Sequence, residues 1–302
     1  MNLECGGGIQ AEQTAAIMIA FEKELLANPC YYVLVVGDVT STLVCSIVAK
    51  KLYTKVAHVE AGIRSGNLSM PEEVNRMVTD SITDLFFTTT PEASENLYKL
   101  GVPEEKVHWV GNVMIDTLRA YEHRFTQPAC WEKMGLADKG YFVMTMHRLA
   151  NVDDGQKLHL FIKKIAKSAE DKKIVFPIHP RTKRVFEELG VNLANIHTED
   201  PLGYLDFNYL VKHSAGVITD SGGITVETTV MDIPCITLRN NTERPETVNI
   251  GTNELFVAIP DKVAPAIKKI LAGEWKNGSI PEKWVGKAAE SVVEILNNLP
   301  DG

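Results

Sequence analysis

Short apolar runs alternate with longer amphipathic segments along the whole chain. The apolar run at residues 31–36 lies between Pro29 and Gly37, which is the pattern of a buried strand. The segment before it places apolar residues at helical spacing. The same alternation predicts strands at residues 31–36, 56–59, 85–88, 107–110, 141–146, 174–178, 217–219 and 235–238. It predicts helices at residues 11–26, 41–52, 91–100, 157–167, 206–213 and 287–296.

Strands that alternate with helices predict parallel sheets covered by helices on both faces. A length of 302 residues suggests two domains, since a domain has about 150 residues. We therefore expect an α/β protein with two Rossmann-like, doubly wound domains that face each other across a cleft. The predicted first domain spans 1–114 and the second, nucleotide-binding domain spans 115–284, because a strand ends near Gly111 and a helix follows. The last segment, 285–302, is a helix that could pack back on the first domain.

The composition excludes several classes of protein. The chain is 45% hydrophobic and 23% charged, as is usual for a folded domain. Its net charge of −8 gives no general attraction for nucleic acid or for an anionic membrane. No apolar run reaches the roughly 18 residues of a membrane span. The first twenty residues lack the basic segment with which a secretory signal peptide begins. The five cysteines are widely spaced, so we expect reduced, mostly buried thiols in a cytoplasmic protein.

Two carboxylates follow consecutive predicted strands. Asp38 comes after the strand at 31–36, and Glu60 comes after the strand at 56–59. Ligands of such folds bind beyond the carboxyl ends of the strands, so both residues are candidates for a site. A structural reading is also open for each: Asp38 could cap the next helix, and Glu60 could pair with Arg64.

Further charged residues stand at comparable places. Glu72 and Arg76 are four apart and can share one face of a helix, either as a solvated pair or as part of a site. The predicted strands at 141–146 and 174–178 are each followed by an imidazole and a guanidinium, which is the pattern of a rim that binds an anion. These residues are His147, Arg148, His179 and Arg181.

The strongest local signal is the segment 219–224, Thr-Asp-Ser-Gly-Gly-Ile, followed by a helix. A strand, a turn of small residues and a helix N-terminus make a phosphate cradle from free N–H groups. Ser221, Gly222 and Gly223 form that turn, and Glu227 one turn later could reach a ribose diol. A second polar cluster after the next strand contains Arg244. Together they favour a nucleotide diphosphate as ligand.

Eight stretches resemble, in the same order, motifs of the non-hydrolysing UDP-N-acetylglucosamine 2-epimerases. They are VVGDVTSTL (35–43), HVEAGIRSGN (58–67), MPEEVNR (70–76), GNVMIDTL (111–118), TMHRLANVDD (145–154), PLGYLDFNYL (201–210), TDSGGITVET (219–228) and RNNTERPETVNIGTN (239–253). The ordered set spans nearly the whole chain, although each motif alone is weak. It implies a GT-B-like architecture of two Rossmann-type domains, in agreement with the strand pattern.

The resemblance implies a reaction and roles for individual residues. UDP-GlcNAc and UDP-ManNAc would interconvert by elimination of UDP to a 2-acetamidoglucal and its re-addition. By motif, Asp38, Glu60 and Glu72 resemble the catalytic acids and His147 the essential histidine. The implied substrate contacts are Arg76, Arg148, His179, Arg181, Phe207 beside the uracil, Ser221, Gly222, Gly223, Glu227 and Arg244. The family needs neither metal nor other cofactor, has UDP and its sugars as ligands, and is commonly homodimeric.

Two departures and three rivals accompany the resemblance. The opening strand and its Gly-Thr-Arg-Pro-Glu-like turn have no counterpart here, so we expect a first domain shortened at its N-terminus. Val226 stands where the family often has Glu. The rivals are a hydrolysing epimerase that releases ManNAc and UDP, a GT-B glycosyltransferase, and an inactive fragment that binds UDP. Glycosyltransferases often carry a second glutamate eight residues from the first, but Thr219 and Cys235 occupy those positions around Glu227.

Overall fold

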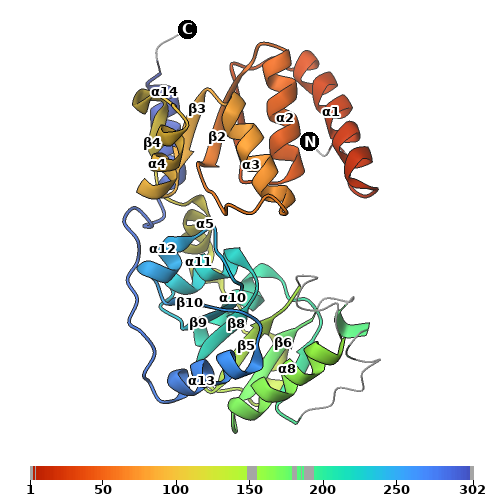
Figure 1. Ribbon diagram of the computed structural model, residues 1–302, viewed down its shortest axis with the longest axis vertical. Coiled ribbons are helices and arrows are strands. Elements are labelled where there is room, and N and C mark those ends of the chain that lie inside the picture. The colour runs from red at the N-terminus through yellow and green to blue at the C-terminus, as the bar shows by residue number, and fades with distance from the viewer. Residues whose placement is uncertain are drawn as a thin grey trace. The chain divides into compact units, whose positions relative to one another are not determined.

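The computed structural model describes residues 3, 5–147, 155–178, 182–184, 186 and 194–299. Two compact units divide the chain (Figure 1). Unit 1 comprises Met1–Val113 together with Lys287–Gly302, and unit 2 comprises Met114–Gly286. Each unit is built on one parallel sheet that carries helices on both faces, which confirms the predicted α/β, doubly wound fold class.

The sheet of unit 1 has four parallel strands in the order β1-β2-β3-β4. They are β1 (Tyr32–Val36), β2 (Lys55–Ala61), β3 (Leu85–Thr88) and β4 (Val107–Trp109). Because the order in space follows the order in the chain, the ends of β1 and β2 are neighbours at the carboxyl edge. Within the described residues β1 is an edge strand, and its Leu34 and Val36 are 47% and 49% exposed.

Helices cover both faces of this sheet. They are α1 (Gln10–Ala27), α2 (Thr40–Lys51), α3 (Pro71–Ile82), α4 (Pro91–Lys99), the 3₁₀ turn η1 (Glu104–Lys106) and α14 (Ala288–Asn297). On one face, α1 and α2 bury Val33 and Val35 of β1. On the opposite face, Ala288 and Val292 of α14 pack with Val59 of β2. The last helix of the chain therefore completes the core of the first unit (Figure 1).

The sheet of unit 2 has six parallel strands in the order β10-β9-β8-β5-β6-β7. They are β5 (Tyr141–Thr145), β6 (Lys173–Pro177), β7 (Ile196–Glu199), β8 (Gly216–Thr219), β9 (Cys235–Leu238) and β10 (Asn253–Phe256). The chain starts in the middle at β5, moves outwards to β7, and returns to β8 on the other side of β5. The strand order thus reverses between β5 and β8, and ligands of such sheets bind at that switch point.

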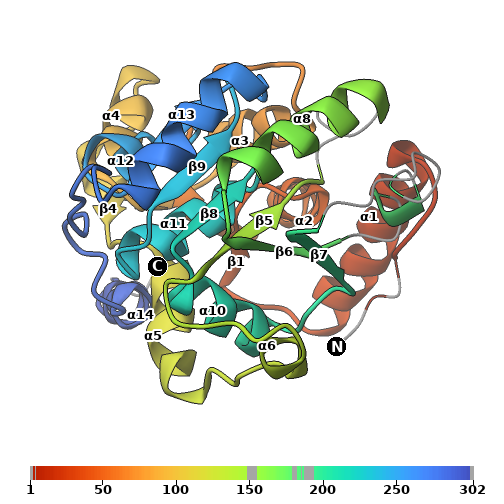
Figure 2. The same cartoon turned by 90° about the horizontal axis from the view of Figure 1, so that it is seen from below.

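The helices of unit 2 form a layer on each face of its sheet (Figure 2). They are α5 (Val113–Tyr121), η2 (Glu122–Arg124), α6 (Ala129–Lys133), α8 (Gly155–Ser168), α10 (Tyr204–His213), α11 (Gly222–Val230), α12 (Pro245–Asn249) and α13 (Pro260–Leu271). On one face, α8 and α13 pack together over Phe142 and Ile218. On the other, α6 and α10 pack over Tyr141 and Val217. Successive residues of a strand therefore point to opposite faces of the sheet and belong to different hydrophobic cores.

Local signals explain where several elements begin and end. In α4, Pro91 occupies the first turn and the Thr90 hydroxyl accepts the N–H of Ala93 at 3.2 Å. Gly101 follows that helix with φ +83, a conformation that favours glycine. The predicted elements correspond to observed ones within a few residues at each end. The pattern does not predict the helices α3, α6, α12 and α13 or the strands β7 and β10.

The cysteines differ in part from the prediction. All five are free thiols, but only Cys130 and Cys235 are buried, so the expectation of mostly buried thiols was wrong. Burial raises the pKa of the Cys235 thiol to about 11, which keeps it unreactive at neutral pH. Among the helices that the structure describes, none is long and apolar enough to cross a bilayer.

Candidate functional site

Two carboxylates from adjacent strands lie at the carboxyl edge of the unit 1 sheet. The parallel register pairs Val36, the last residue of β1, with Val59, so Gly37-Asp38 follow β1 beside Glu60, which is the next-to-last residue of β2 rather than the residue after it. The N–H of Gly37 donates to the carbonyl of Val59 at 3.0 Å. A Cβ placed on Gly37 would lie 3.9 Å from Oε2 of Glu60. The structure therefore brings the turn that carries Asp38 next to the Glu60 carboxylate.

Glu60 has an unusual backbone conformation. Its φ is +68, and the register of β2 against β3 shifts between Val59 and Ala61. A residue other than glycine pays about 1–2 kcal/mol in this left-handed region. Such strain persists where the surroundings impose it and concentrates at functional sites. Glu60 is thus held in a costly position at the edge where ligands of this fold bind.

Arg76 of α3 connects this edge to the helix. Its guanidinium is 3% exposed and forms ion pairs with Asp38 and, at 2.9 Å, with Glu73. Glu73 also accepts the N–H groups of Ser65 and Gly66, each at 2.9 Å. Burial alone would raise the pKa of Glu73, but the two amides and Arg76 outweigh it and lower that pKa. A buried carboxylate that the sequence analysis did not single out thus holds Arg76 against Asp38.

The structural alternative for Asp38 is not what the structure shows. The N-cap of α2 is Val39, without a side-chain cap, and Asp38 pairs with Arg76 instead. Arg64 pairs with Asp80 at 2.7 Å. Arg76 pairs with Glu73, three residues away, whereas Glu72 is exposed on the same helix.

In unit 2, His147 follows β5 and Asp220 follows β8, at the switch point of the sheet. The fully buried carboxylate of Asp220 lies 2.7 Å from Nδ1 of His147, whose side chain is 55% exposed. It also accepts the backbone N–H of His147 at 3.1 and 3.2 Å. Asp220 therefore fixes the orientation of the ring and leaves Nε2 as the nitrogen that can meet a ligand. The sequence contains a signal for this role, an Asp directly after the neighbouring strand.

The helix α11 begins at Gly222 with Ser221 as its N-cap, and the Ser221 side chain makes no capping bond. Amide groups at such a helix start are available to an anion. A Cβ on Gly222 would lie 2.7 Å from Oε1 of Glu243 and 3.3 Å from Nη1 of Arg239. These two residues form a two-point ion pair at 3.0 and 2.5 Å. A side chain at 222 would therefore have to displace the ends of this ion pair.

Glu227 lies one turn into α11 and is 7% exposed. Burial raises its pKa, although hydrogen bonds from Tyr204 and Asn208 of α10 oppose the effect. Burial and the neighbouring Glu227 also raise the pKa of Tyr204. Phe207, between those two residues of α10, packs partly buried against the core of that face. The structure thus brings Glu227 together with the helix that carries Phe207.

The remaining predicted residues divide into two groups. Arg244 is 8% exposed and is the N-cap of the short helix α12, where its N–H donates to the Thr242 hydroxyl at 3.0 Å. Arg148, His179 and Arg181 lie outside the described residues.

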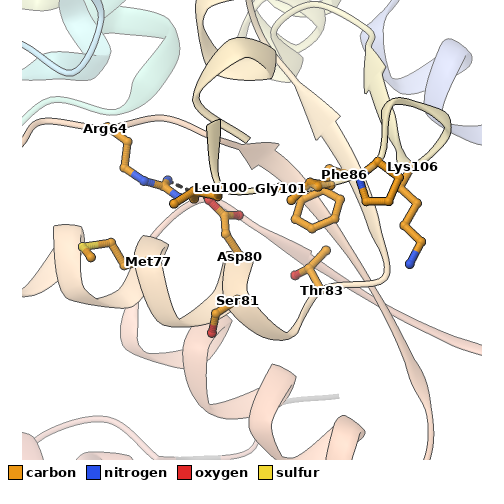
Figure 3. A pocket seen from close by; sticks show the side chains of 11 residues that line it. Arg64, Met77, Asp80, Ser81, Thr83, Phe86, Leu100, Gly101 and Lys106 are labelled. Atoms are coloured by element: carbon orange, nitrogen blue, oxygen red, sulfur yellow. Dashed lines mark ion pairs between the residues drawn. The ribbon is translucent and has the colours of Figure 1, made fainter. Parts of the chain in front are cut away.

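A pocket of about 510 Å³ in unit 1 includes none of the predicted site residues (Figure 3). It is lined by Arg64, Met77, Asp80, Ser81, Thr83, Phe86, Leu100, Gly101, Val102, Pro103 and Lys106. Figure 3 shows Arg64 and Asp80 joined by their ion pair at its wall. In the described part of the chain, no three His, Cys, Asp or Glu side chains are placed to hold a metal ion.

Sequence comparison finds relatives along the whole chain. The UDP-N-acetylglucosamine 2-epimerase of Methanocaldococcus jannaschii is 40% identical, and the match covers 98% of this chain and 83% of the relative. The UDP-2,3-diacetamido-2,3-dideoxy-D-glucuronate 2-epimerase of Pseudomonas aeruginosa is 36% identical, over 99% of this chain and 83% of the relative.

Solved structures agree with the sequence matches. The crystal structure of the M. jannaschii UDP-GlcNAc 2-epimerase in complex with UDP-GlcNAc and UDP has a TM-score of 0.85 at 38% identity, and the match covers 98% of this chain and 83% of that one. The Neisseria meningitidis UDP-GlcNAc 2-epimerase bound to UDP-GlcNAc has a TM-score of 0.88 at 28% identity, over 97% and 83%. These matches confirm the predicted GT-B-like fold class. A family profile described as UDP-N-acetylglucosamine 2-epimerase matches residues 1–297, and the chain belongs to that family.

Proposed function

We propose that this chain interconverts UDP-GlcNAc and UDP-ManNAc at C2, without hydrolysis, by elimination and re-addition of UDP. The observation that carries the proposal is the pair of carboxylates, Asp38 and Glu60, on adjacent strand ends of unit 1. Glu60 is held there in a strained conformation, and Asp38 is paired with the buried Arg76. Carboxylates in this arrangement suit a reaction that needs both a base and an acid at one carbon.

The chemistry explains why carboxylates suffice. The C2 proton of the sugar is not beside a carbonyl group, so a carboxylate cannot remove it from the resting substrate. As the bond from C1 to the UDP oxygen breaks, its electron pair leaves with UDP and positive charge develops at the ring. That charge acidifies the C2 proton, a carboxylate takes it, and the C1–C2 double bond forms. Re-addition of the UDP oxygen to C1 and of a proton to the other face of C2 completes the epimerisation.

Unit 2 would hold the leaving nucleotide. In this proposal the amide groups at the start of α11, from Ser221 to Gly223, bind the diphosphate together with His147. The pair of His147 with Asp220 keeps the ring oriented for that contact. Glu227 accepts the ribose hydroxyls, and Phe207 lies beside the uracil. Arg148, His179, Arg181 and Arg244 are further candidates for contacts with the phosphates.

The test is proton NMR of UDP-GlcNAc incubated with this chain in D2O. We expect UDP-ManNAc to appear and deuterium to enter C2 of both sugars, because the abstracted proton exchanges with solvent before re-addition. Asp38→Asn and Glu60→Gln should abolish the exchange. Asp84→Asn should not, since Asp84 pairs with Lys50 just before β3, at the edge of the sheet opposite to the carboxyl ends of the strands. Free ManNAc with UDP would instead identify a hydrolysing enzyme. An unchanged C2 proton despite saturable UDP binding would contradict the proposal.

A second sugar is a specific alternative substrate. The P. aeruginosa relative, named for a diacetamido glucuronate sugar, matches almost as well as the M. jannaschii enzyme, at 36% against 40% identity. The elimination needs the same groups for either sugar, so only the contacts with C3 and C6 would differ. Equal enzyme amounts should therefore be tested with both UDP-sugars. We expect the higher kcat/KM with UDP-GlcNAc, and the reverse ratio would reassign the substrate.

A further inference from the structure

His58 of β2 is fully buried, and each of its ring nitrogens has a hydrogen-bond partner. Nδ1 lies 2.7 Å from Oδ1 of Asp80, and Nε2 lies 2.9 Å from the carbonyl oxygen of Gly37. A carbonyl oxygen can only accept a hydrogen bond, so Nε2 must carry a proton. The charge of the ring then depends on whether the proton between Nδ1 and Asp80 belongs to the ring or to the carboxyl group.

The partners of Asp80 assign that proton to the ring. Its Oδ2 accepts the N–H of Gly62 at 3.1 Å and the guanidinium of Arg64 at 2.7 Å. Burial would raise the pKa of Asp80, whereas the charge and hydrogen bond of Arg64, which do not depend on the state of His58, lower it. Asp80 is therefore an ionised carboxylate that cannot donate. Against an ionised Asp80, the 2.7 Å contact of Nδ1 with Oδ1 needs a proton on Nδ1 as well as the one on Nε2.

The His58 ring binds the turn that leads to Asp38. Gly37 has φ +71, its N–H donates to Val59 of β2, and its carbonyl accepts from His58 of the same strand. The turn is thus fastened to β2 at two points, and Glu60 follows Val59 in that strand. A chain of contacts runs from Arg64 and Asp80, at the pocket wall in Figure 3, through His58 to this turn.

We propose that His58, held as an imidazolium by Asp80, is a positioning residue that fixes the Asp38 turn against Glu60, an inference that rests on the proposed function. Beside an ionised Asp80, a neutral ring has only one donor nitrogen, so it would lose either its bond to Asp80 or its bond to Gly37. Loss of the Gly37 bond releases the turn, and a displaced carboxylate catalyses poorly even when the substrate is bound. The arrangement should therefore affect kcat more than the affinity for UDP.

The experiment compares Asp80→Leu with Asp84→Leu. Leucine offers no partner to Nδ1 of His58, whereas the amide of an asparagine at 80 could donate to it and keep the ring on Gly37. Asp84 also accepts a backbone N–H, from Val56 at 2.8 Å, and a cation, Lys50 at 2.8 Å, and within the described residues its hydrogen-bond partners do not include His58. We expect Asp80→Leu to lower kcat for C2 epimerisation at least ten-fold, with KM and the Kd of UDP changed less than three-fold. Asp84→Leu should leave all three within two-fold of wild type. Equal kcat values for wild type and Asp80→Leu would overturn the proposal.

A spectroscopic measurement tests the charge of the ring without a variant. In a ¹H–¹⁵N spectrum of the wild-type protein with labelled histidine at pH 7.5, His58 should show protons on both ring nitrogens. A neutral ring in an active wild-type protein overturns this inference alone, whereas absence of C2 exchange in the wild type overturns the proposed function.

A second pair of variants keeps the test valid where Asp80→Leu does not fold. His58→Gln retains an N–H donor that can reach Gly37, and His58→Leu has none. We expect the glutamine variant to keep at least five-fold more kcat than the leucine variant. Equal kcat values in the two would overturn the positioning role.

Discussion

The buried carboxylate of Asp220 holds both the ring and the backbone of His147. It lies 2.7 Å from Nδ1 and also accepts the N–H of the same residue at 3.1 and 3.2 Å. These contacts join the ends of β5 and β8, the two strands between which the order of the unit 2 sheet reverses. The orientation of the exposed His147 ring is thus set by a buried residue at the end of the neighbouring strand.

Asp220→Asn should therefore lower the rate of epimerisation by roughly 10²-fold, since an aligned imidazole contributes about that much to a proton transfer or to charge stabilisation. The rate is measured by C2 deuterium exchange and the affinity for UDP by calorimetry. Asp138→Asn is the matched control, because Asp138 also binds Nδ1 of a histidine, His213, at 2.8 Å, but at the surface. An equal loss of rate in both variants would contradict the role of Asp220.

The strain at Glu60 predicts a difference between two inactive variants. Both Glu60→Gly and Glu60→Ala remove the carboxylate and should abolish exchange. Only glycine adopts the φ of +68 without steric cost, so the glycine variant should be more stable than the alanine variant by about 1 kcal/mol. Urea unfolding measures the difference. A more stable alanine variant would show that the left-handed conformation is not imposed at this residue.

The crowding at Gly222 predicts that Gly222→Ala destabilises unit 2. Its methyl group would lie 2.7 Å from Oε1 of Glu243, which is held in an ion pair with Arg239. Overpacking of this kind costs about 1–3 kcal/mol, and we also expect weaker UDP binding. Gly203→Ala is the control, because a Cβ there meets nothing within 4 Å and φ is −65. Thermal unfolding and calorimetry should separate the two variants, and equal stabilities would refute the prediction.

Glu73 predicts a pH dependence of stability. The pKa of Glu73 is lowered in the folded protein. Its contribution to the free energy of unfolding is therefore complete above the pKa of the unfolded chain, about 4.3, and is lost as the pH falls through the pKa of the folded protein. Glu73→Gln removes one of the two carboxylates that pair with the buried Arg76, and it should lower the free energy of unfolding by about 3 kcal/mol at pH 7. The difference from wild type, measured by urea unfolding, should shrink below about pH 4. The exposed neighbour variant Glu72→Gln should show neither effect.

Much of the fold follows from apolar runs that are buried on both faces. The strands β3 and β8 have all four residues buried, and their runs predict them directly. The two strands that the pattern misses, β7 and β10, are the edges of the six-stranded sheet. Most of their residues are only partly buried, so the sequences IHTE and NELF contain no continuous apolar run. Edge position, which depends on the whole sheet, is what hides them.

The site could be predicted where a charged residue stands at the carboxyl end of a strand. Parallel strands present their carboxyl ends at one edge of a sheet, and this rule alone predicts that Asp38 and Glu60 lie close together. It does not predict that Arg76 pairs with Glu73 rather than Glu72. Both glutamates lie within one turn of Arg76, and only the packing of α3 decides which is buried. The roles of Asp80 and Asp220 depend in the same way on which histidine each carboxylate reaches.

The position of α14 has a consequence for biosynthesis. Unit 2 is one continuous stretch of chain, but the core of unit 1 contains Ala288 and Val292 from the last helix. During translation, which proceeds at about 5–20 residues per second, unit 2 can fold as soon as it leaves the ribosome. The strands of unit 1 are synthesised before unit 2, and the face of their sheet around Val59 stays uncovered until α14 emerges. Unit 1 is therefore begun before unit 2 and completed after it, and its uncovered sheet is a surface that a chaperone can bind during synthesis.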